Sequence, residues 1–361
     1  MEKGNGQMVT IKDVARVAGV SASTVSRALS GRIPVEESTR RKVLKAAKEL
    51  NYQPNALAKG LKEGRTGTIG LIVPNICNPV FPLVSRGVED TARKSGYTVI
   101  LCNTDEDVSI EMEYIQKLRK KWVDGIILAT SGKQSGHITE LKDSGLPVVL
   151  LIRRLEDRVD AVVVDNNEAA RQAVAYLIRT GHRKIAMVNG DQGLTLYRER
   201  FQGYLRALRE SGLAFDPTLA LEIPIVQNCY ETVREFLAAR PAPDAVFAAS
   251  DPMALQVMRA VKDAGYRVPD DISVIGFDDL ESAPFLDPPL TTVRQPLYQM
   301  GAAAAERMIS RIEGKAATPE ERAPSVLVMD TELVVRQSAR DRTDEKEQHG
   351  SCETIGKGQN G

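Results

Sequence analysis

The sequence contains few of the residues from which metal sites and catalytic centres are commonly built. It has only 4 cysteines and 3 histidines in 361 residues, with no Cys-x-x-Cys pair and no histidine at metal-ligand spacing from a cysteine. Free thiols are therefore expected at the cysteines, and no metal or cofactor is expected. His182, in the segment GHRK, is expected to have a structural rather than a catalytic role.

Long apolar runs and common enzyme motifs are also missing. No stretch of about 18 apolar residues could cross a membrane, and the N-terminus has no apolar signal-peptide core, so we expect a cytoplasmic protein without a membrane partner. No GxGxxG follows a predicted strand, no P-loop or GxSxG elbow occurs, and no Cys or Ser has an evident His partner. An enzyme is therefore a poor alternative. The length suffices for two or three domains.

Charge is balanced overall but unevenly distributed. Residues 1–65 hold 13 Lys and Arg against 6 Asp and Glu, an excess of 7 positive charges that the remaining residues offset. A basic head on an acidic body indicates that the head, and not the body, contacts phosphate groups.

The basic head begins with the pattern of a helix-turn-helix. Thr10 is suited to cap a first helix, with Asp13 reaching back to it, and the chain turns at Gly19. Ser21 is suited to cap a second helix that runs from Ala22 to Leu29. The shared core is expected to consist of Ile11, Val14, Ala15, Ala18, Val20, Val25, Ala28 and Leu29. The outer face of the second helix then points Ser23, Thr24, Ser26 and Arg27 towards a DNA major groove. An ordinary helical hairpin is the alternative.

A third helix and a short hinge helix follow. Residues 37–50 have helical spacing, with Val43, Leu44, Ala47 and Leu50 expected to cover the first two helices. Residues 55–61 can form two helical turns, but isolated helices shorter than about 12 residues are marginal, so we expect this one to form only when DNA holds it. A flexible tether is the alternative, because Gly64, Thr66 and Gly67 come next.

From residue 68 the pattern changes to short apolar strands that alternate with amphipathic helices. The expected strands are 69–73, 98–102, 125–129, 148–152, 161–164, 184–188, 245–248 and 273–276. The expected helices include 83–94, 110–122, 168–179, 198–211, 230–239 and 253–264. This alternation predicts parallel sheets covered on both faces, and the number of strands favours two lobes of similar size. Residues 1–9 and 339–361 are polar and without periodicity, and we expect both ends to be disordered.

The carboxyl ends of the expected strands carry polar residues. Ligands of parallel sheets bind at this edge, so a cleft between the lobes is expected to collect its hydrogen-bonding groups there. The groups concerned are Asn75 with Asn78, Asn103-Thr104-Asp105, Ser250-Asp251 and Asp278-Asp279.

Many segments resemble one known family. The chain reads TIKDVARVAGVSASTVSRALSG and NYQPNALAKGL, then GLIVPNICNPVF, DGIILAT, VDNNEAA, RERFQGY, SDPMALQ, VPDDISVIGFDD and LTTVRQP. These segments, in this order, resemble the lactose-repressor/galactose-repressor family of bacterial transcription regulators. The resemblance implies a dimeric repressor of operator DNA that responds to a small carbohydrate-type effector.

The resemblance also implies a domain organisation. A helix-turn-helix domain (10–53) and a hinge (54–67) precede an effector-binding and dimerisation domain (68–338) with a type I periplasmic-binding-protein fold. The chain then crosses between the two lobes three times. Lobe one is expected to comprise 68–166 and 295–325, and lobe two 167–294 and 326–338.

The resemblance assigns roles to individual residues. Leu61 matches a residue that wedges into a base step in the minor groove, and Arg27 matches a base-reading position. The residues expected to contact DNA are Thr10, Ser21, Ala22, Ser23, Thr24, Ser26, Arg27, Asn55, Ala58, Lys59 and Leu61. The residues expected to contact the effector are Asn78, Phe81, Arg153, Arg200, Ser250, Asp278 and Gln295. For Phe81 a role in the core is an equal alternative.

Two departures from the family pattern bear on the effector. Sugar-binding members place Asp-Arg after the fourth strand, where this chain has Arg153-Arg154. They also have a second aromatic residue beside the position of Phe81, where this chain has Val80. The loss of a carboxylate acceptor with retention of arginines leads to the hypothesis of an anionic effector, such as a sugar phosphate, held by Arg153 and Arg200. An exported sugar-binding protein remains an alternative for residues 68–338, but it leaves Thr10–Leu61 without a use.

Overall fold

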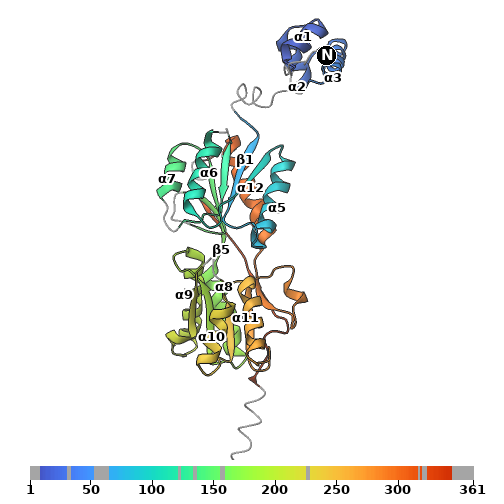
Figure 1. Ribbon diagram of the computed structural model, residues 1–361. Helices are drawn as coiled ribbons and strands as arrows, with labels where there is room; N and C mark the ends of the chain where they lie inside the picture. The colour runs from blue at the N-terminus through green and yellow to red at the C-terminus, as the bar shows by residue number, and fades with distance from the viewer. Residues whose placement is uncertain are drawn as a thin grey trace, which may run out of the picture. The chain divides into compact units, whose positions relative to one another are not determined.

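The computed structural model describes residues 9–30, 34–52, 65–120, 123–132, 136–154, 159–224, 228–315, 318 and 323–343. The predicted hinge helix, with Asn55, Ala58, Lys59 and Leu61, lies outside the described residues. The chain divides into two compact units, residues 1–66 and 67–361 (Figure 1). No helix in the described ranges is long and apolar enough to cross a membrane.

The first unit is the predicted three-helix head, built from α1 (Ile11–Ala18), α2 (Ala22–Ser30) and α3 (Glu37–Glu49). The Asp13 carboxylate accepts hydrogen bonds from the backbone N–H of Thr10 at 3.0 Å and from its hydroxyl at 2.7 Å. Gly19 ends α1 with a left-handed φ of 67°, a conformation that glycine adopts without steric cost. The Ser21 hydroxyl accepts from the Thr24 N–H at 3.1 Å and so caps α2. Both predicted caps and the turn are confirmed.

The core of the head contains every residue predicted for it, all packed in one cluster. One prediction for the third helix is wrong, since Leu44 is 46% exposed. The buried face of α3 is formed by Val43, Ala46 and Ala47 instead. A helix buries residues three and four apart, and Leu44 lies one position round the helix from that stripe.

The second unit contains two six-stranded sheets, as the alternation of strands and helices predicted. The first sheet has the order β11-β5-β4-β3-β1-β2 and the second β12-β10-β9-β8-β6-β7. All recorded strand pairs are parallel except β10 with β12. The strands of the first sheet are β1 (Thr68–Val73), β2 (Thr98–Asn103), β3 (Gly125–Leu128), β4 (Val148–Leu151), β5 (Asp160–Val164) and β11 (Val326–Met329). Those of the second are β6 (Ile185–Gly190), β7 (Ala220–Ile223), β8 (Ala245–Ala248), β9 (Ser273–Asp278), β10 (Thr291–Arg294) and β12 (Glu332–Val334).

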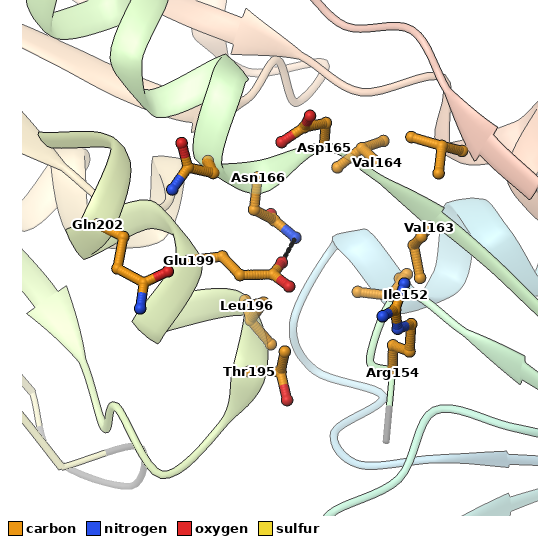
Figure 2. A pocket seen from close by; sticks show the side chains of 12 residues that line it. Ile152, Arg154, Val163, Val164, Asp165, Asn166, Thr195, Leu196, Glu199 and Gln202 are labelled. Atoms are coloured by element: carbon orange, nitrogen blue, oxygen red, sulfur yellow. Dashed lines mark hydrogen bonds between the residues drawn. The ribbon is translucent and has the colours of Figure 1, made fainter. Parts of the chain in front are cut away.

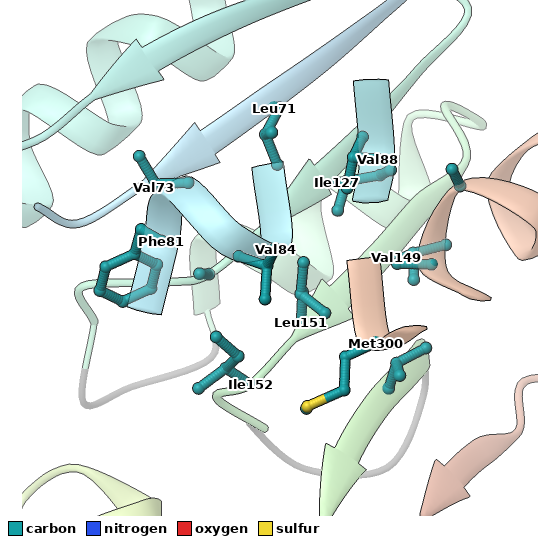
Figure 3. Packing of buried hydrophobic residues seen from close by; sticks show 14 of the residues in the cluster. Leu71, Val73, Phe81, Val84, Val88, Ile127, Val149, Leu151, Ile152 and Met300 are labelled. Atoms are coloured by element: carbon teal, nitrogen blue, oxygen red, sulfur yellow. The ribbon is translucent and has the colours of Figure 1, made fainter. Parts of the chain in front are cut away.

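Helices cover both faces of each sheet, as parallel sheets require. In lobe one they are α5 (Val80–Lys94), α6 (Val108–Lys120), α7 (Gly136–Asp143) and α12 (Leu297–Glu313). In lobe two they are α8 (Asn166–Arg179), α9 (Thr195–Glu210), α10 (Tyr230–Ala239) and α11 (Asp251–Asp263), with the short 3-10 helices η1 (Pro217–Leu219) and η2 (Ala283–Phe285). The cluster on one face of the first sheet packs α5 and α12 (Figure 3), and the other packs α6 and α7. The expected helices did not include α7 and α12.

The chain passes between the two sheets three times, after β5, after β10 and after β11. The third crossing differs from the expectation. β11 pairs with β5 from Val326 to Met329, so these residues belong to lobe one and not to lobe two. The expected disorder from residue 339 is also wrong for 339–343, because Ala339 is buried and the Arg342 guanidinium donates to the carbonyls of Asp270 and Asp271. Residues 344–361 lie outside the described ranges.

Candidate functional site

The outer face of α2 carries the side chains predicted to meet DNA. Ser23 and Arg27 are exposed, whereas Ala22 is partly buried against the core of the head. The hydroxyl of Ser21 lies 2.7 Å from that of Ser23 and 2.8 Å from that of Thr24, so three hydroxyls gather at the first turn of the helix. Helix N-termini and hydroxyl groups both bind phosphate oxygens, which makes this end of α2 suited to the DNA backbone.

Helix α3 adds positive charge to the head. Its exposed residues include Arg40, Arg41, Lys42, Lys45 and Lys48. Among the described residues two of these form ion pairs, Arg41 with Glu37 and Lys45 with Glu49, and both pairs are solvent-exposed. Exposed pairs of this kind contribute little, so the charge remains available to a polyanion.

The carboxyl ends of lobe-one strands hold a buried arginine. Arg153 follows β4, and its guanidinium makes a two-point ion pair with Glu106, with both N–O distances at 2.7 Å. The same guanidinium donates to the Thr130 carbonyl at 3.0 Å, after β3. Arg153 is therefore fixed in place and its charge is balanced.

Backbone strain gathers around these strand ends. Positive φ angles occur at Ile152 (65°), Asp105 (51°), Glu106 (61°), Asp278 (132°) and Asp279 (54°). At Ile152 the Arg153 N–H donates to the Leu151 carbonyl at 2.7 Å, which closes a three-residue turn. A β-branched residue at positive φ is a rare outlier, and such strain clusters at ligand sites. The strained turn aims Arg153 towards Glu106.

Phe81 was predicted to pack in the core or to contact the effector, and its position suits both roles. Its ring is buried in the cluster that joins α5 to the first sheet, beside Val84 and Ile152 (Figure 3). The Arg153 guanidinium lies 5.9 Å from the ring centroid. The packing role is thus present in the fold, and the ring also forms a wall beside Arg153.

Lobe two also has a buried arginine near its strand ends, Arg200 of α9. This buried guanidinium lies 3.6 Å from the ring centroid of Phe277, donates to Asn166 Oδ1 at 2.9 Å and also donates to the Ala249 carbonyl. Burial lowers the pKa of Arg200, while the nearby Asp278 raises it. Arg200 is held as firmly as Arg153.

Asp278 and Gln295 form the polar floor of lobe two. Gln295 Nε2 donates to Asp278 Oδ1 at 2.7 Å, and the Asp251 N–H lies 3.4 Å from the other oxygen. Burial is the main cause that raises the pKa of Asp278 to about 7; the charge of Arg200 opposes the rise and that of Asp251 adds to it. Asp278 therefore sits near the midpoint of its titration at neutral pH.

Tyr197 connects the two lobes. Its ring lies 6.0 Å from the Arg200 guanidinium. Burial raises the pKa of its hydroxyl, and the charges of Arg153 and Arg200 lower it, which brings residues of both lobes into electrostatic reach of one ring. Arg153 contacts the end of a lobe-one strand through the Thr130 carbonyl and Arg200 the end of a lobe-two strand through the Ala249 carbonyl, which is the edge of the sheets where an effector cleft was predicted.

Three buried polar atoms near this cleft have no hydrogen-bond partner among the described residues. They are Arg153 Nε, Asn189 Oδ1 and Gln295 Oε1. Buried polar atoms are nearly always paired, so unpaired ones mark a place for a ligand. The other two residues predicted to contact the effector, Ser250 and Asn78, form hydrogen bonds at helix N-termini. Ser250 caps α11 by accepting from the Met253 N–H, and Asn78 accepts from the Val80 N–H at the start of α5.

A separate pocket of about 320 Å³ opens beside the cleft (Figure 2). Asn166 joins the two: its Oδ1 accepts from Arg200, and its Nδ2 donates to Glu199 of the pocket at 3.1 Å. None of the residues predicted to contact the effector lines it. The pocket is lined by Ile152, Arg154, Val163, Val164, Asp165, Asn166, Asn167, Thr195, Leu196, Glu199, Gln202 and Val328.

Several residues of the cleft were not predicted. The sequence lacks the family's carboxylate after the fourth strand, and Glu106 supplies a carboxylate there instead. Glu106 lies one residue beyond the polar segment Asn103-Thr104-Asp105. Tyr197 supplies a second ring, and Asn166 and Asn189 supply amides. Glu106, Asn166 and Asn189 had a usable sequence signal, since each follows the end of a predicted strand.

One Ser–His pair does exist, contrary to the sequence-based expectation. His182 Nε2 lies 2.9 Å from the Ser273 hydroxyl, and Nδ1 lies 2.9 Å from the Leu177 carbonyl. Both side chains are fully buried, and Ser273 begins β9, at the end of the sheet opposite to the cleft. The predicted structural role of His182 is confirmed.

Comparison with known proteins agrees with this division into head and body. Residues 10–55 match the family model of bacterial regulatory proteins of the lacI family, and residues 66–334 match the model of periplasmic binding proteins and the sugar binding domain of the LacI family. A ribose operon repressor of Halalkalibacterium halodurans is 39% identical over 308 residues, which cover 85% of this chain and 92% of the relative. The transcriptional repressor PurR of Photobacterium profundum is 37% identical over 337 residues, or 92% and 99% of the two chains.

Solved structures give the same result. A lac repressor dimer bound to operator and the anti-inducer ONPF aligns with a TM-score of 0.83 at 26% identity, covering 92% of this chain and all of the other. The transcriptional regulator CelR in complex with cellobiose aligns with a TM-score of 0.69 at 34% identity, with the same coverage. With a helix-turn-helix head, a two-lobed body and full-length relatives that are transcriptional repressors, this chain belongs to the LacI family of bacterial regulatory proteins.

Proposed function

We propose that the chain is a cytoplasmic repressor that binds operator DNA through α2 as a homodimer and is controlled by a small, uncharged polyhydroxylated effector in the cleft between its lobes. A single helix-turn-helix buries little surface, and two copies on paired half-sites reach usable affinity. The related lac repressor was solved as a dimer on its operator, which supports the same arrangement here.

The observation that carries the choice of effector is the charge balance of the cleft. Arg153 is neutralised by Glu106, and Arg200 lies beside Asp278. The lobe-one arginine therefore offers an anion no unbalanced charge, which favours an uncharged effector over an anionic one.

The unpartnered atoms favour the same class of ligand. Gln295 Oε1 and Asn189 Oδ1 accept hydrogen bonds, whereas Arg153 Nε donates one. A sugar hydroxyl both donates and accepts, so a ring with several hydroxyls satisfies all three atoms. The partly buried ring of Tyr197 adds apolar surface for a C–H face of such a ring. Complexes of related proteins with cellobiose and with ribose support the assignment.

Regulation rather than catalysis fits the chain. The relatives are transcriptional regulators, and the single Ser–His pair of the described residues is buried away from the cleft. An enzymatic role therefore has no support from the site.

A gel-shift assay with DNA upstream of the gene and its neighbours tests the proposal. We expect a retarded band with the full-length protein, and we expect its midpoint to move when one of a panel of neutral pentoses, hexoses and disaccharides is added. The matched panel of sugar phosphates should have a smaller effect. No retardation under any condition would contradict the repressor assignment, and a response to the phosphates alone would contradict the uncharged effector.

A further inference from the structure

A second carboxylate of lobe one is completely buried and has no role in the site described so far. Glu111, on α6, has an exposed fraction of 0%. Its Oε1 accepts from the Thr130 hydroxyl at 2.7 Å and pairs with His137 Nε2 at 2.7 Å, and its Oε2 accepts from the Ser131 N–H at 2.5 Å. A buried carboxylate is costly unless it is paired and hydrogen-bonded, and three donors stabilise Glu111 here.

These bonds fix the segment that follows β3. The Gly132 N–H donates to the Thr130 hydroxyl oxygen at 2.9 Å, and the Ser131 hydroxyl lies 2.7 Å from that of Thr104. Side chains from α6, α7 and the end of β2 therefore hold three consecutive residues that belong to no helix or strand. Without those bonds the backbone of this segment has few constraints.

The held segment is also the support of Arg153. The Thr130 carbonyl accepts from the Arg153 guanidinium at 3.0 Å. The other restraint on Arg153 is Glu106, which precedes α6 by two residues. The N-terminal end of α6 thus restrains Arg153 in two ways. Glu106 pairs with the guanidinium directly, and Glu111 holds Thr130, whose carbonyl accepts from the same guanidinium.

We propose that Glu111 and His137 are positioning residues for the effector site: they hold the Thr130 carbonyl, which holds Arg153 against Phe81. Neither residue contacts the proposed cleft directly. This inference rests on the proposed function only in that Arg153 belongs to the effector site. Removing the His137 donor frees one lone pair of Glu111, loosens residues 130–132 and lets Arg153 sample other orientations.

Two substitutions at one position separate positioning from general packing. His137→Gln keeps an N–H donor that reaches Glu111, whereas His137→Leu keeps most of the volume and loses the donor. In the full-length protein, hydrogen–deuterium exchange is measured for peptides that cover residues 126–132 and 148–154. Calorimetry with D-ribose, D-glucose and cellobiose measures binding, and a gel shift without sugar measures DNA binding.

With His137→Leu we expect faster exchange in both segments, and about five- to tenfold weaker binding of whichever sugar the unmodified protein binds, because one hydrogen bond to a charged group is lost. His137→Gln should restore both properties, and DNA binding without sugar should not change. Faster exchange confined to α7, or a glutamine variant as weak as the leucine variant, overturns the proposal.

Thr130→Val provides a second route if His137→Leu does not fold. At constant shape it removes the hydroxyl that donates to Glu111 and accepts from the Gly132 N–H, and it should reproduce the faster exchange at 148–154. If none of the three sugars binds the unmodified protein, the choice of effector fails. The exchange pattern still decides whether Glu111 and His137 hold Arg153.

Discussion

The guanidinium of Arg153 and the carboxylate of Glu106 lie parallel in a two-point ion pair, with both N–O distances at 2.7 Å and both side chains almost fully buried. The two residues come from different turns at the same edge of the first sheet. This pair balances the charge of Arg153, and we expect it to influence which ligands the proposed cleft binds.

Changing Glu106→Gln should reverse the charge preference of the cleft. The variant keeps the shape of the side chain but leaves the Arg153 charge without its partner. We expect roughly tenfold weaker binding of the neutral effector, because the arginine loses its fixed orientation, and a gain in affinity for the corresponding sugar phosphate. Calorimetry with the neutral and phosphorylated forms of one sugar measures both changes.

Glu222→Gln is the matched control, since this glutamate of lobe two hydrogen-bonds Gln192 on the surface. It should bind both forms of the sugar as the unmodified protein does. Unchanged selectivity in Glu106→Gln would show that the ion pair does not face the ligand.

The pKa of Asp278 should make stability depend on pH. Burial is the main cause that raises this pKa from 3.8 to about 7; the charge of Arg200 opposes the rise and that of Asp251 adds to it. Between those two pH values the folded state keeps a proton that the unfolded state has released. The unfolding free energy therefore falls as pH rises through this window, by up to about 1.4 kcal/mol per pH unit for one proton.

Urea unfolding between pH 4.5 and 8 tests this dependence. Asp278→Asn has no such proton, so the difference between unmodified protein and variant should shrink or change sign as pH rises from 4.5 to 7, and then stay constant. The exposed Asp287→Asn should follow the unmodified protein at all pH values. A difference that is flat from pH 4.5 to 8 rules out the raised pKa.

The three-helix head could be derived almost completely from the sequence, because the interactions that determine its fold are local. Thr10 and Asp13 are three residues apart, Ser21 and Thr24 are three residues apart, and Gly19 adopts its turn without outside help. Leu44 was misjudged because four apolar residues in α3 fit helical spacing equally well, and only tertiary packing selects the buried ones.

The cleft could be derived only in part because its contacts are distant in sequence. Arg153 and Glu106 are 47 residues apart, and their pairing depends on the order of β2, β3 and β4 in the sheet. The positive φ of Ile152 contradicts the local preference of a β-branched residue and is imposed by its surroundings. β11 was assigned to the wrong lobe because it precedes the third crossing, whose position no local pattern marks.

Arg27 should read bases rather than phosphates. It is exposed on the second helix of the head, and arginine binds guanine O6 and N7 with two hydrogen bonds. Arg27→Ala is expected to weaken binding of the specific operator by about 1–3 kcal/mol and to leave binding of random DNA nearly unchanged. Fluorescence anisotropy on both DNAs measures the two affinities.

Arg234→Ala is the matched control, because this exposed arginine of lobe two forms an ion pair with Glu231 on its own helix. It should change neither affinity. Equal losses of Arg27→Ala on operator and random DNA would place Arg27 on the phosphate backbone instead.

Two exposed apolar side chains of lobe two should lie in the dimer interface. Leu255 on α11 is 50% exposed and Phe285 in η2 is 87% exposed. The segment that contains η2 is hydrogen-bonded to both ends of α11: the Leu280 N–H donates to Asp251, and Lys262 donates to the Asp287 carbonyl. Exposed aromatic and leucine side chains on one surface are typical of protein–protein contacts.

Phe285→Ser should therefore shift the protein towards monomers in sedimentation velocity and weaken operator binding in parallel, because two half-sites are no longer engaged together. Phe215→Ser is the matched control: this ring is also partly exposed, but it packs edge-on against Phe201 and Tyr204 on the α9 side of lobe two. It should lower stability slightly without changing the sedimentation coefficient. A dimer that persists in Phe285→Ser and in Leu255→Glu would move the interface to another surface of the protein.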